Sequence, residues 1–173
     1  MRVLVTGGAG YIGSHTCVSL LENKHDVLVF DNLSNSSQIA LERVKCITKR
    51  SLEFVEGDIR DQATLLKVMR GFAPDAVIHF AGLKAVHESV QDPFSYYDVN
   101  VCGSIEVIRA MKTVGCNLLI FSSSATVYGA PKYLPYDEDH PTVPTSPYGW
   151  SKLMVEQILE DWVKAENRNM AVS

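Results

Sequence analysis

The sequence predicts an α/β fold built on a Rossmann-like, doubly wound parallel sheet that ends after about five strands. Apolar runs and helical patterns alternate along the whole chain, which is typical of parallel strands joined by crossover helices. A glycine-rich turn, Gly7–Gly13, separates the first apolar run from the first helical pattern, and Asp31 closes the second apolar run. Because such crossovers are right-handed, we expect the strand order 3-2-1-4-5.

Each expected element follows from its local pattern. The predicted strands are Arg2–Thr6, Val27–Asp31, Leu52–Glu56, Ala76–Phe80 and Asn117–Phe121. The predicted helices run from Tyr11 to about Asn23, over Ile39–Ile47, from an N-cap at Asp61 through Met69, from about Pro93 to Lys112, and from about Tyr148 to Glu166. Met170–Ser173 is interpreted as the start of a sixth strand.

The composition limits the classes of partner. Hydrophobic residues make up 46% and charged residues 21% of the 173 residues, which is ordinary for a soluble globular protein with a real core. The formal net charge of −4 argues against a nucleic-acid or anionic-membrane partner. No apolar run approaches the ~20 residues of a membrane span, and no signal peptide is indicated. The cysteines and histidines show no metal-ligand spacing, so we expect no metal, reduced thiols and a cytoplasmic location.

The glycine-rich turn is the first candidate binding site. Gly8, Gly10 and Gly13 fit G-x-G-x-x-G, while Gly7, Gly10 and Gly13 fit a second spacing of the same kind. Glycine permits a tight turn, a close approach of the backbone to a pyrophosphate, and close packing of a helix on a strand. The N–H groups of the following helix, including those of Tyr11 and Ile12, would then face the phosphates. This context predicts a dinucleotide site.

Asp31 indicates which dinucleotide is bound. An acid at the tip of the second strand can accept hydrogen bonds from the ribose hydroxyls of adenosine and would repel a 2′-phosphate. No arginine follows before Arg43, so we predict NAD rather than NADP. The polar loop after Asp31 completes this part of the expected site, with Asn32, Leu33, Ser34, Asn35 and Ser36.

A tyrosine–lysine pair is the candidate catalytic group. Tyr148 and Lys152 are four residues apart, so they share one face of a helix, and they follow Ser122–Ser124 at the end of the fifth strand. Free tyrosine is a poor base at neutral pH because its pKa is about 10. A nearby ammonium and a positively charged nicotinamide would favour the phenolate. Tyr148 could then take a proton from a substrate hydroxyl that Ser124 holds in line, while Lys152 also holds the nicotinamide ribose.

Several motifs together resemble the extended short-chain dehydrogenase/reductases, in particular the members that epimerise UDP-glucose and UDP-galactose at C4. The motifs are Thr6–Gly13, Asp31–Ser34, Glu56–Ile59, His79–Val86, Ser122–Gly129 and Ser146–Leu153. The resemblance implies tightly held NAD, which oxidises the sugar at C4 and returns the hydride to the opposite face. It also implies roles for matching residues: Asp58 and Ile59 at the adenine, Asn100 as a support, Lys84, Ser124 and Tyr148 at the substrate, and Phe80, Ala81, Gly82, Leu83, Lys84 and Ser122 along the cofactor.

One rival is disfavoured and two alternatives stay open. Related 4,6-dehydratases carry Asp-Glu where this chain has Ala125-Thr126, so elimination of water would lack its extra acid and base, which favours an epimerase. Another sugar-nucleotide-modifying member of the family is the first alternative. The second arises because family members are roughly twice this length: we expect residues 1–173 to be the NAD-binding domain without the substrate domain. Such a chain could bind NAD with little catalysis, and its bare surfaces would favour a homo-oligomer.

Overall fold

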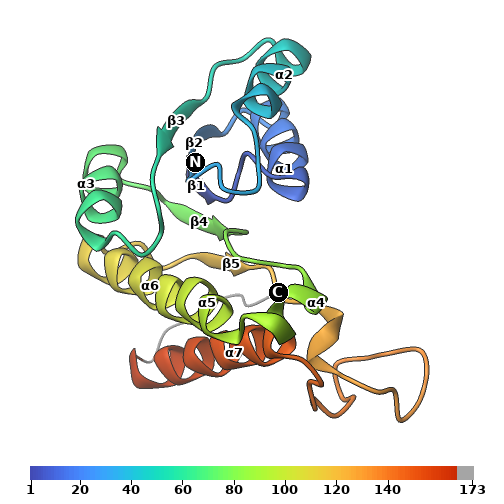
Figure 1. Cartoon of the computed structure of the whole chain (residues 1–173). Coiled ribbons are helices and arrows are strands. Elements are labelled where there is room, and N and C mark those ends of the chain that lie inside the picture. The colour runs from blue at the N-terminus through green and yellow to red at the C-terminus, as the bar shows by residue number, and fades with distance from the viewer. Residues whose placement is uncertain (167–173) are drawn as a thin grey trace.

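Five parallel strands form the centre of the computed structural model, which describes residues 1–166 (Figure 1). The strands are β1 (Arg2–Thr6), β2 (Asp26–Asp31), β3 (Glu53–Glu56), β4 (Ala76–His79) and β5 (Leu119–Phe121). Their order is β3-β2-β1-β4-β5, which confirms the predicted fold class and strand order. All five point the same way, so their carboxyl ends share one edge of the sheet.

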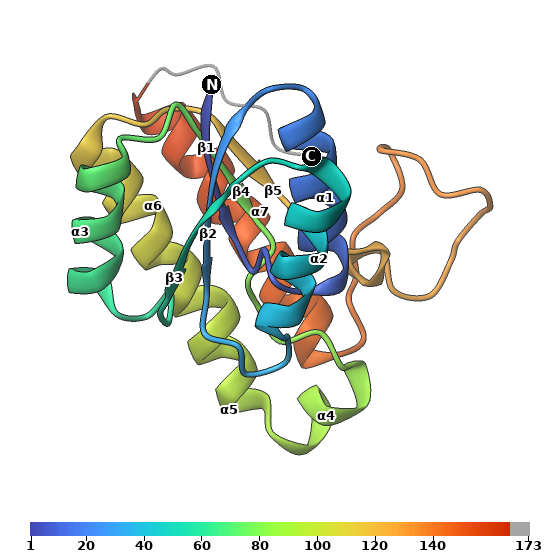
Figure 2. The ribbon, with the colours of Figure 1, turned by 90° about the horizontal axis from the view of Figure 1, so that it is seen from above.

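Helices cover both faces of the sheet, and each face has its own apolar core (Figures 1 and 2). On one face, α1 (Tyr11–Glu22) and α2 (Gln38–Thr48) pack Cys17, Leu21 and Leu41 against Val5 and Val29. The other face is covered by α3 (Gln62–Phe72), α6 (Gly103–Val114) and α7 (Pro147–Glu166). Because both faces are covered, β4 is buried along its whole length, as its continuous apolar run predicts.

Local signals set the helix boundaries, and one of them, the N-cap at Asp61, was predicted from the sequence. The Asp61 carboxylate accepts a hydrogen bond from Thr64 N at the start of α3, so this residue is the N-cap. The Ser37 hydroxyl does the same for Ile39 N at the start of α2. At the end of α6, Gly115 adopts the left-handed conformation with φ +75°, which favours glycine.

The helix expected from Pro93 to Lys112 is not a uniform α-helix, so that prediction was wrong in part. The structure has α5 (Pro93–Tyr96), then a π-helical turn over Tyr97–Cys102, then α6. A separate short helix, α4 (Val86–Gln91), precedes them. The wider turn directs Asn100 into the interior, where it bonds to groups from distant parts of the chain. Periodicity cannot reveal such a turn, because its cause lies in tertiary contacts.

Between β5 and α7 the chain leaves the sheet. A 3-10 turn, Ala125–Val127, is followed by a long segment without helix or strand over residues 129–146, which projects away from the sheet in Figures 1 and 2. His140 is buried at its base among the rings of Tyr128, Tyr133 and Tyr136. The sixth strand expected at Met170–Ser173 lies outside the described residues. Over residues 1–166, no helix has the length and apolar character needed to cross a membrane.

Candidate functional site

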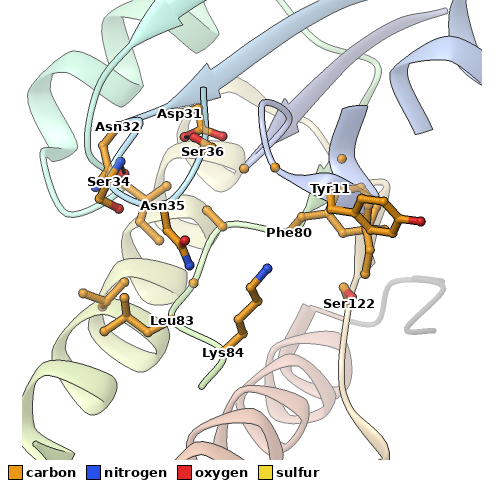
Figure 3. A pocket seen from close by; sticks show the side chains of 18 of the residues that line it. Tyr11, Asp31, Asn32, Ser34, Asn35, Ser36, Phe80, Leu83, Lys84 and Ser122 are labelled. Atoms are coloured by element: carbon orange, nitrogen blue, oxygen red, sulfur yellow. Dashed lines mark hydrogen bonds between the residues drawn. The ribbon is translucent and has the colours of Figure 1, made fainter. Parts of the chain in front are cut away.

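A cavity of about 390 Å³ opens at the carboxyl ends of the strands. Residues from the loops after β1, β2, β3, β4 and β5 line it, together with the start of α7. Figure 3 shows Asp31, Asn32, Ser34 and Ser36 gathered at one side, Tyr11 and Ser122 at the other, and Lys84 extending between them. Ligands of doubly wound sheets bind at this edge, next to the point where the strand order reverses.

The glycine turn after β1 forms one wall of the cavity. Gly7 has φ +69°, and a Cβ there would lie 2.5 Å from Ala81 N. A Cβ at Gly13 would collide with the carbonyl oxygen of Gly7. Gly10 caps α1 without a side-chain hydrogen bond, and the first turn of α1 contains no acidic residue. The helix therefore presents its first N–H groups to the cavity, and Gly10, Tyr11, Ile12 and Gly13 line it as predicted from the sequence.

Asp31 organises the wall next to the glycine turn. The residue is 7% exposed, and its carboxylate accepts hydrogen bonds from Ala9 N (2.9 Å), Leu33 N (2.9 Å) and Ser36 Oγ (2.8 Å). Because a carboxylate has about four acceptor positions, capacity is left for a ligand hydroxyl. Leu33 does not line the cavity: it packs against the core beneath β2, with φ 56°.

Asp58 and Ile59 follow β3 and line the cavity beside Asn32. The Arg60 guanidinium donates to Asp58 Oδ1 and Oδ2 at 2.9 and 2.7 Å, and Asn32 Nδ2 donates at 3.1 Å. The hydrogen bonds from Arg60 have the largest effect, and together with the bond from Asn32 they hold the pKa of the Asp58 carboxyl well below its usual range. Arg60 also donates to Asp98 on the π-helical turn at 2.6 Å. Sequence reasoning missed Arg60, although a cation two residues after an acid is a signal that can be read locally.

The loop after β4 is held from behind by Asn100. Leu83 N donates to Asn100 Oδ1 at 2.7 Å, while Asn100 Nδ2 lies 3.0 Å from both Leu83 O and Ser151 Oγ. Asn100 is buried and does not line the cavity, so the structure places it as a support for the loop. The loop itself lines the cavity with the expected residues Phe80, Ala81, Gly82, Leu83 and Lys84.

A buried chain of hydrogen bonds under this loop fixes the state of His79. Ser104 Oγ donates to Asn100 O (2.5 Å), so it must accept from His79 Nε2–H (2.8 Å). His79 Nδ1 then accepts from Thr6 Oγ1 (2.5 Å), at the end of β1. Burial lowers the pKa of His79 to about 3, and the charge of Lys152 adds to the effect. His79 is therefore a neutral structural link between β1, β4 and α6, which the sequence did not reveal.

The predicted catalytic residues meet at the β5 side of the cavity. Tyr148, Lys152, Ser122 and Ser124 all line it. Lys152 Nζ donates to Ser122 O at 2.9 Å and lies 6.0 Å from the centre of the Tyr148 ring. Lys152 is 6% exposed, and this burial lowers the pKa of its ammonium to about 8.

Two neighbours hold the side chains of the predicted catalytic residues. The ring of Tyr148 meets the ring of buried Tyr96 edge to face at 6.3 Å. The Ser124 hydroxyl accepts from Thr126 N (3.2 Å) and Thr126 Oγ1 (2.9 Å) in the 3-10 turn. The sequence did not single out Tyr96, and neither did it predict three other lining residues, which are Phe30, Gly57 and Val99.

The fold and the cavity define the class: a Rossmann-like α/β protein with the G-x-G-x-x-G turn beneath its ligand cavity. A family model described as GDP-mannose 4,6 dehydratase matches residues 4–173, and the chain belongs to this family. This membership confirms the resemblance that the sequence motifs indicate.

Individual relatives carry a different description. The chain is 57% identical over 167 residues to the UDP-glucose 4-epimerase of Haemophilus influenzae, covering 96% of this chain and 49% of that protein. It is 53% identical to the UDP-glucose 4-epimerase of Bacillus subtilis over the same shares of each chain. The crystal structure of the Bifidobacterium longum UDP-glucose 4-epimerase in complex with NAD⁺ and UDP matches with a TM-score of 0.97 at 48% identity, over 99% of this chain and 52% of that one. The chain spans about half the length of the curated relatives it matches.

Proposed function

We propose that this chain is the NAD-binding part of a UDP-glucose 4-epimerase, with residues 1–173 as its dinucleotide domain. One observation carries the proposal: a single cavity joins the glycine turn to Ser124, Tyr148 and Lys152. The relatives named above support the particular reaction, because they are UDP-glucose 4-epimerases.

The residues of the cavity fit NAD. The crowding around Gly7 and Gly13 leaves room only for glycine, so the backbone and the start of α1 can approach a pyrophosphate closely. Asp31 can accept from a ribose hydroxyl and would repel a 2′-phosphate, which favours NAD over NADP. Asp58 and Ile59 would hold the adenine side, while Tyr148 and Lys152 would hold the nicotinamide side. When bound, NAD would supply a hydride acceptor for the sugar carbon.

The chemistry left to the chain itself is proton transfer and orientation. Tyr148 would take the proton of the sugar C4 hydroxyl and later return it. Ser124 would hold that hydroxyl in line, because its own position is fixed by Thr126. The Lys152 ammonium, 6.0 Å from the centre of the Tyr148 ring, would stabilise the negative charge that develops on the tyrosine oxygen during that transfer. Lys84, which Figure 3 shows extending into the cavity, would contact the substrate from the β4 loop.

The placement of carboxylates favours an epimerase over a dehydratase. Elimination of water from a 4-keto sugar requires an additional acid and base next to the sugar. Among the cavity-lining residues in the described part of the chain, the carboxylates are Asp31 and Asp58, which follow β2 and β3 on the adenosine side. The positions next to Ser124 are Ala125 and Thr126. The keto intermediate would therefore have no route except to take its hydride back. This favours epimerisation even though the matching family model is described as a dehydratase.

A second candidate is an NAD-binding module with little catalysis. The sugar must be held with its C4 hydroxyl at Tyr148, and misplacement by ~1 Å can cost ~100-fold in rate. Binding of the remote UDP group supplies such orientation, and loss of remote contacts lowers turnover as well as affinity. We therefore expect these 173 residues on their own to be a weak epimerase. Ile120 on β5 and Leu118 just before it expose apolar surface, which favours self-association with a second copy and can be measured by sedimentation velocity.

Two measurements test the proposal. Nucleotide released on denaturation, identified by reverse-phase chromatography, should be NAD or NADH. A coupled assay for conversion of UDP-galactose to UDP-glucose should then give a rate far below that of a full-length homologue. Conversion within about tenfold of that homologue would show that this chain builds a sugar site without the remaining length. Absence of any bound or bindable nucleotide would contradict the proposal.

A further inference from the structure

Two of the three serines after β5 bond to successive turns of α7, and the third lines the cavity together with Tyr148, one turn earlier on the helix. Ser122 O accepts the hydrogen bond from Lys152 Nζ, Ser124 lines the cavity with Tyr148, and Ser123 Oγ donates to Glu156 Oε1. Tyr148, Lys152 and Glu156 are each four residues apart, so they lie on one face of the helix. Glu156 thus belongs to the row of side chains that includes the predicted catalytic pair, one turn farther from the cavity.

Glu156 differs from the ordinary acidic residues of α7. Its side chain is half-buried and bonded to the end of β5. Glu160, one turn further on, is exposed and pairs with Lys164 at 3.3 Å. Glu160 bonds within its own helix, whereas Glu156 is bonded to Ser123 after β5, which indicates a role for Glu156 at the β5–α7 junction.

The electrostatic surroundings of Lys152 explain what a carboxylate contributes there. Burial disfavours the ammonium, and the charge of Glu156 opposes this effect. His79 approaches from β4 as a neutral ring, Tyr148 from α7, and Phe121 from β5 with its ring centre 4.8 Å from Nζ. Lys84 lines the same cavity and adds positive charge, while Asp31 and Asp58 follow the distant strands β2 and β3.

We propose that Glu156 is a positioning residue of the catalytic centre, which acts through Lys152 and Ser123 rather than on the substrate. Its negative charge stabilises the protonated form of the Lys152 side chain. Its hydrogen bond from Ser123 fixes the end of β5, where Ser122 O accepts the hydrogen bond from Lys152 and Ser124 lines the cavity with Tyr148. The inference rests on the proposed function only in assigning Tyr148 and Lys152 to the chemistry, because the contacts themselves belong to the free chain.

The test is the titration of Lys152 in the 173-residue chain without cofactor or sugar, followed through its side-chain carbon and nitrogen chemical shifts. The signal is assigned by its loss in Lys152→Arg. Wild type should titrate near pH 8. Glu156→Gln keeps an acceptor for the Ser123 hydroxyl but removes the charge, so the midpoint should fall by about one pH unit. Ser123→Ala releases the carboxylate toward water, so it should lower the midpoint by a smaller amount.

Glu160→Gln is the matched control, since it removes an exposed charge from the same helix and should leave the midpoint unchanged. The proposal is overturned if the midpoint in Glu156→Gln stays at the wild-type value. Should Glu156→Gln fail to fold, an unchanged midpoint in Ser123→Ala would overturn it equally. A failure of the proposed function would look different: NAD would not bind to wild type, while the dependence of the Lys152 titration on Glu156 would persist.

Discussion

Replacement of Lys152 by methionine should stabilise the free chain near neutral pH. The pKa of Lys152 falls from the ordinary lysine value of 10.5 to about 8 because burial disfavours its charge. At about 1.4 kcal/mol for each pKa unit, the buried ammonium destabilises the fold by about 3 kcal/mol. Methionine has a similar shape but loses the hydrogen bond to Ser122 O, which costs about 1 kcal/mol. We therefore expect a net gain of about 2 kcal/mol in the free energy of unfolding at pH 7.

The pH dependence distinguishes this cause from simple packing. Lys152 is charged in both the folded and unfolded states below pH 8, so the cost is fully present there. Between pH 8 and 10.5 the folded state has released its proton while the unfolded state has not, and the cost disappears as pH rises. At pH 10 the destabilisation by Lys152 should be only about 1 kcal/mol, so the advantage of methionine should vanish.

Urea denaturation of wild type and Lys152→Met at pH 7 and pH 10 measures both effects. Lys164→Met, at an exposed position of the same helix, is the control and should change stability by less than about 0.5 kcal/mol at either pH. A Lys152→Met protein that is less stable than wild type at pH 7, or a difference that does not depend on pH, would show that the buried ammonium does not destabilise the fold.

Three further predictions concern ligand binding and chemistry. Asp31→Ala should weaken NAD binding by about tenfold or more, because charge-assisted hydrogen bonds are lost, and calorimetric titration measures the affinity. Equal affinity of wild type for NADP would contradict the assignment of NAD as the cofactor. Tyr148→Phe should abolish reduction of bound NAD by UDP-galactose while leaving the affinity for NAD intact, and the absorbance of NADH measures the reduction. Near-normal reduction would show that another residue is the base. Asn100→Ala should destabilise the fold by about 1–3 kcal/mol and also weaken NAD binding, because Leu83 loses its buried partner. Unchanged NAD affinity in that variant would show that Asn100 has no part in shaping the cofactor loop.

The sequence could predict the parts of this structure that local patterns determine. Alternation of apolar runs and helical periodicity suffices for the strand order, and Asp61 marks the start of α3 because its cap bond spans three residues. Most candidate site residues could also be placed, because polar residues after parallel strands must reach the same edge of the sheet.

The parts that escaped prediction depend on contacts between distant segments. The π-helical turn exists where Asn100 bonds Leu83 and Ser151, which are 17 and 51 residues away along the chain. The neutral state of His79 follows from a chain of hydroxyl donors that only the fold brings together. Glu156 is an intermediate case, because its spacing from Lys152 could be read in the sequence but its bond to Ser123 could not.

NAD is expected to occupy the cavity along the carboxyl edge of the sheet. Chemical-shift mapping of the ¹⁵N-labelled chain with NAD tests this residue by residue. Shifts are expected at Gly10, Asp31, Gly82 and Lys152, from both halves of the sheet, with saturation at the same NAD concentration. Absence of shifts at these positions, or shifts confined to the groove between α1 and α2 near Val18 and Arg43, would contradict it.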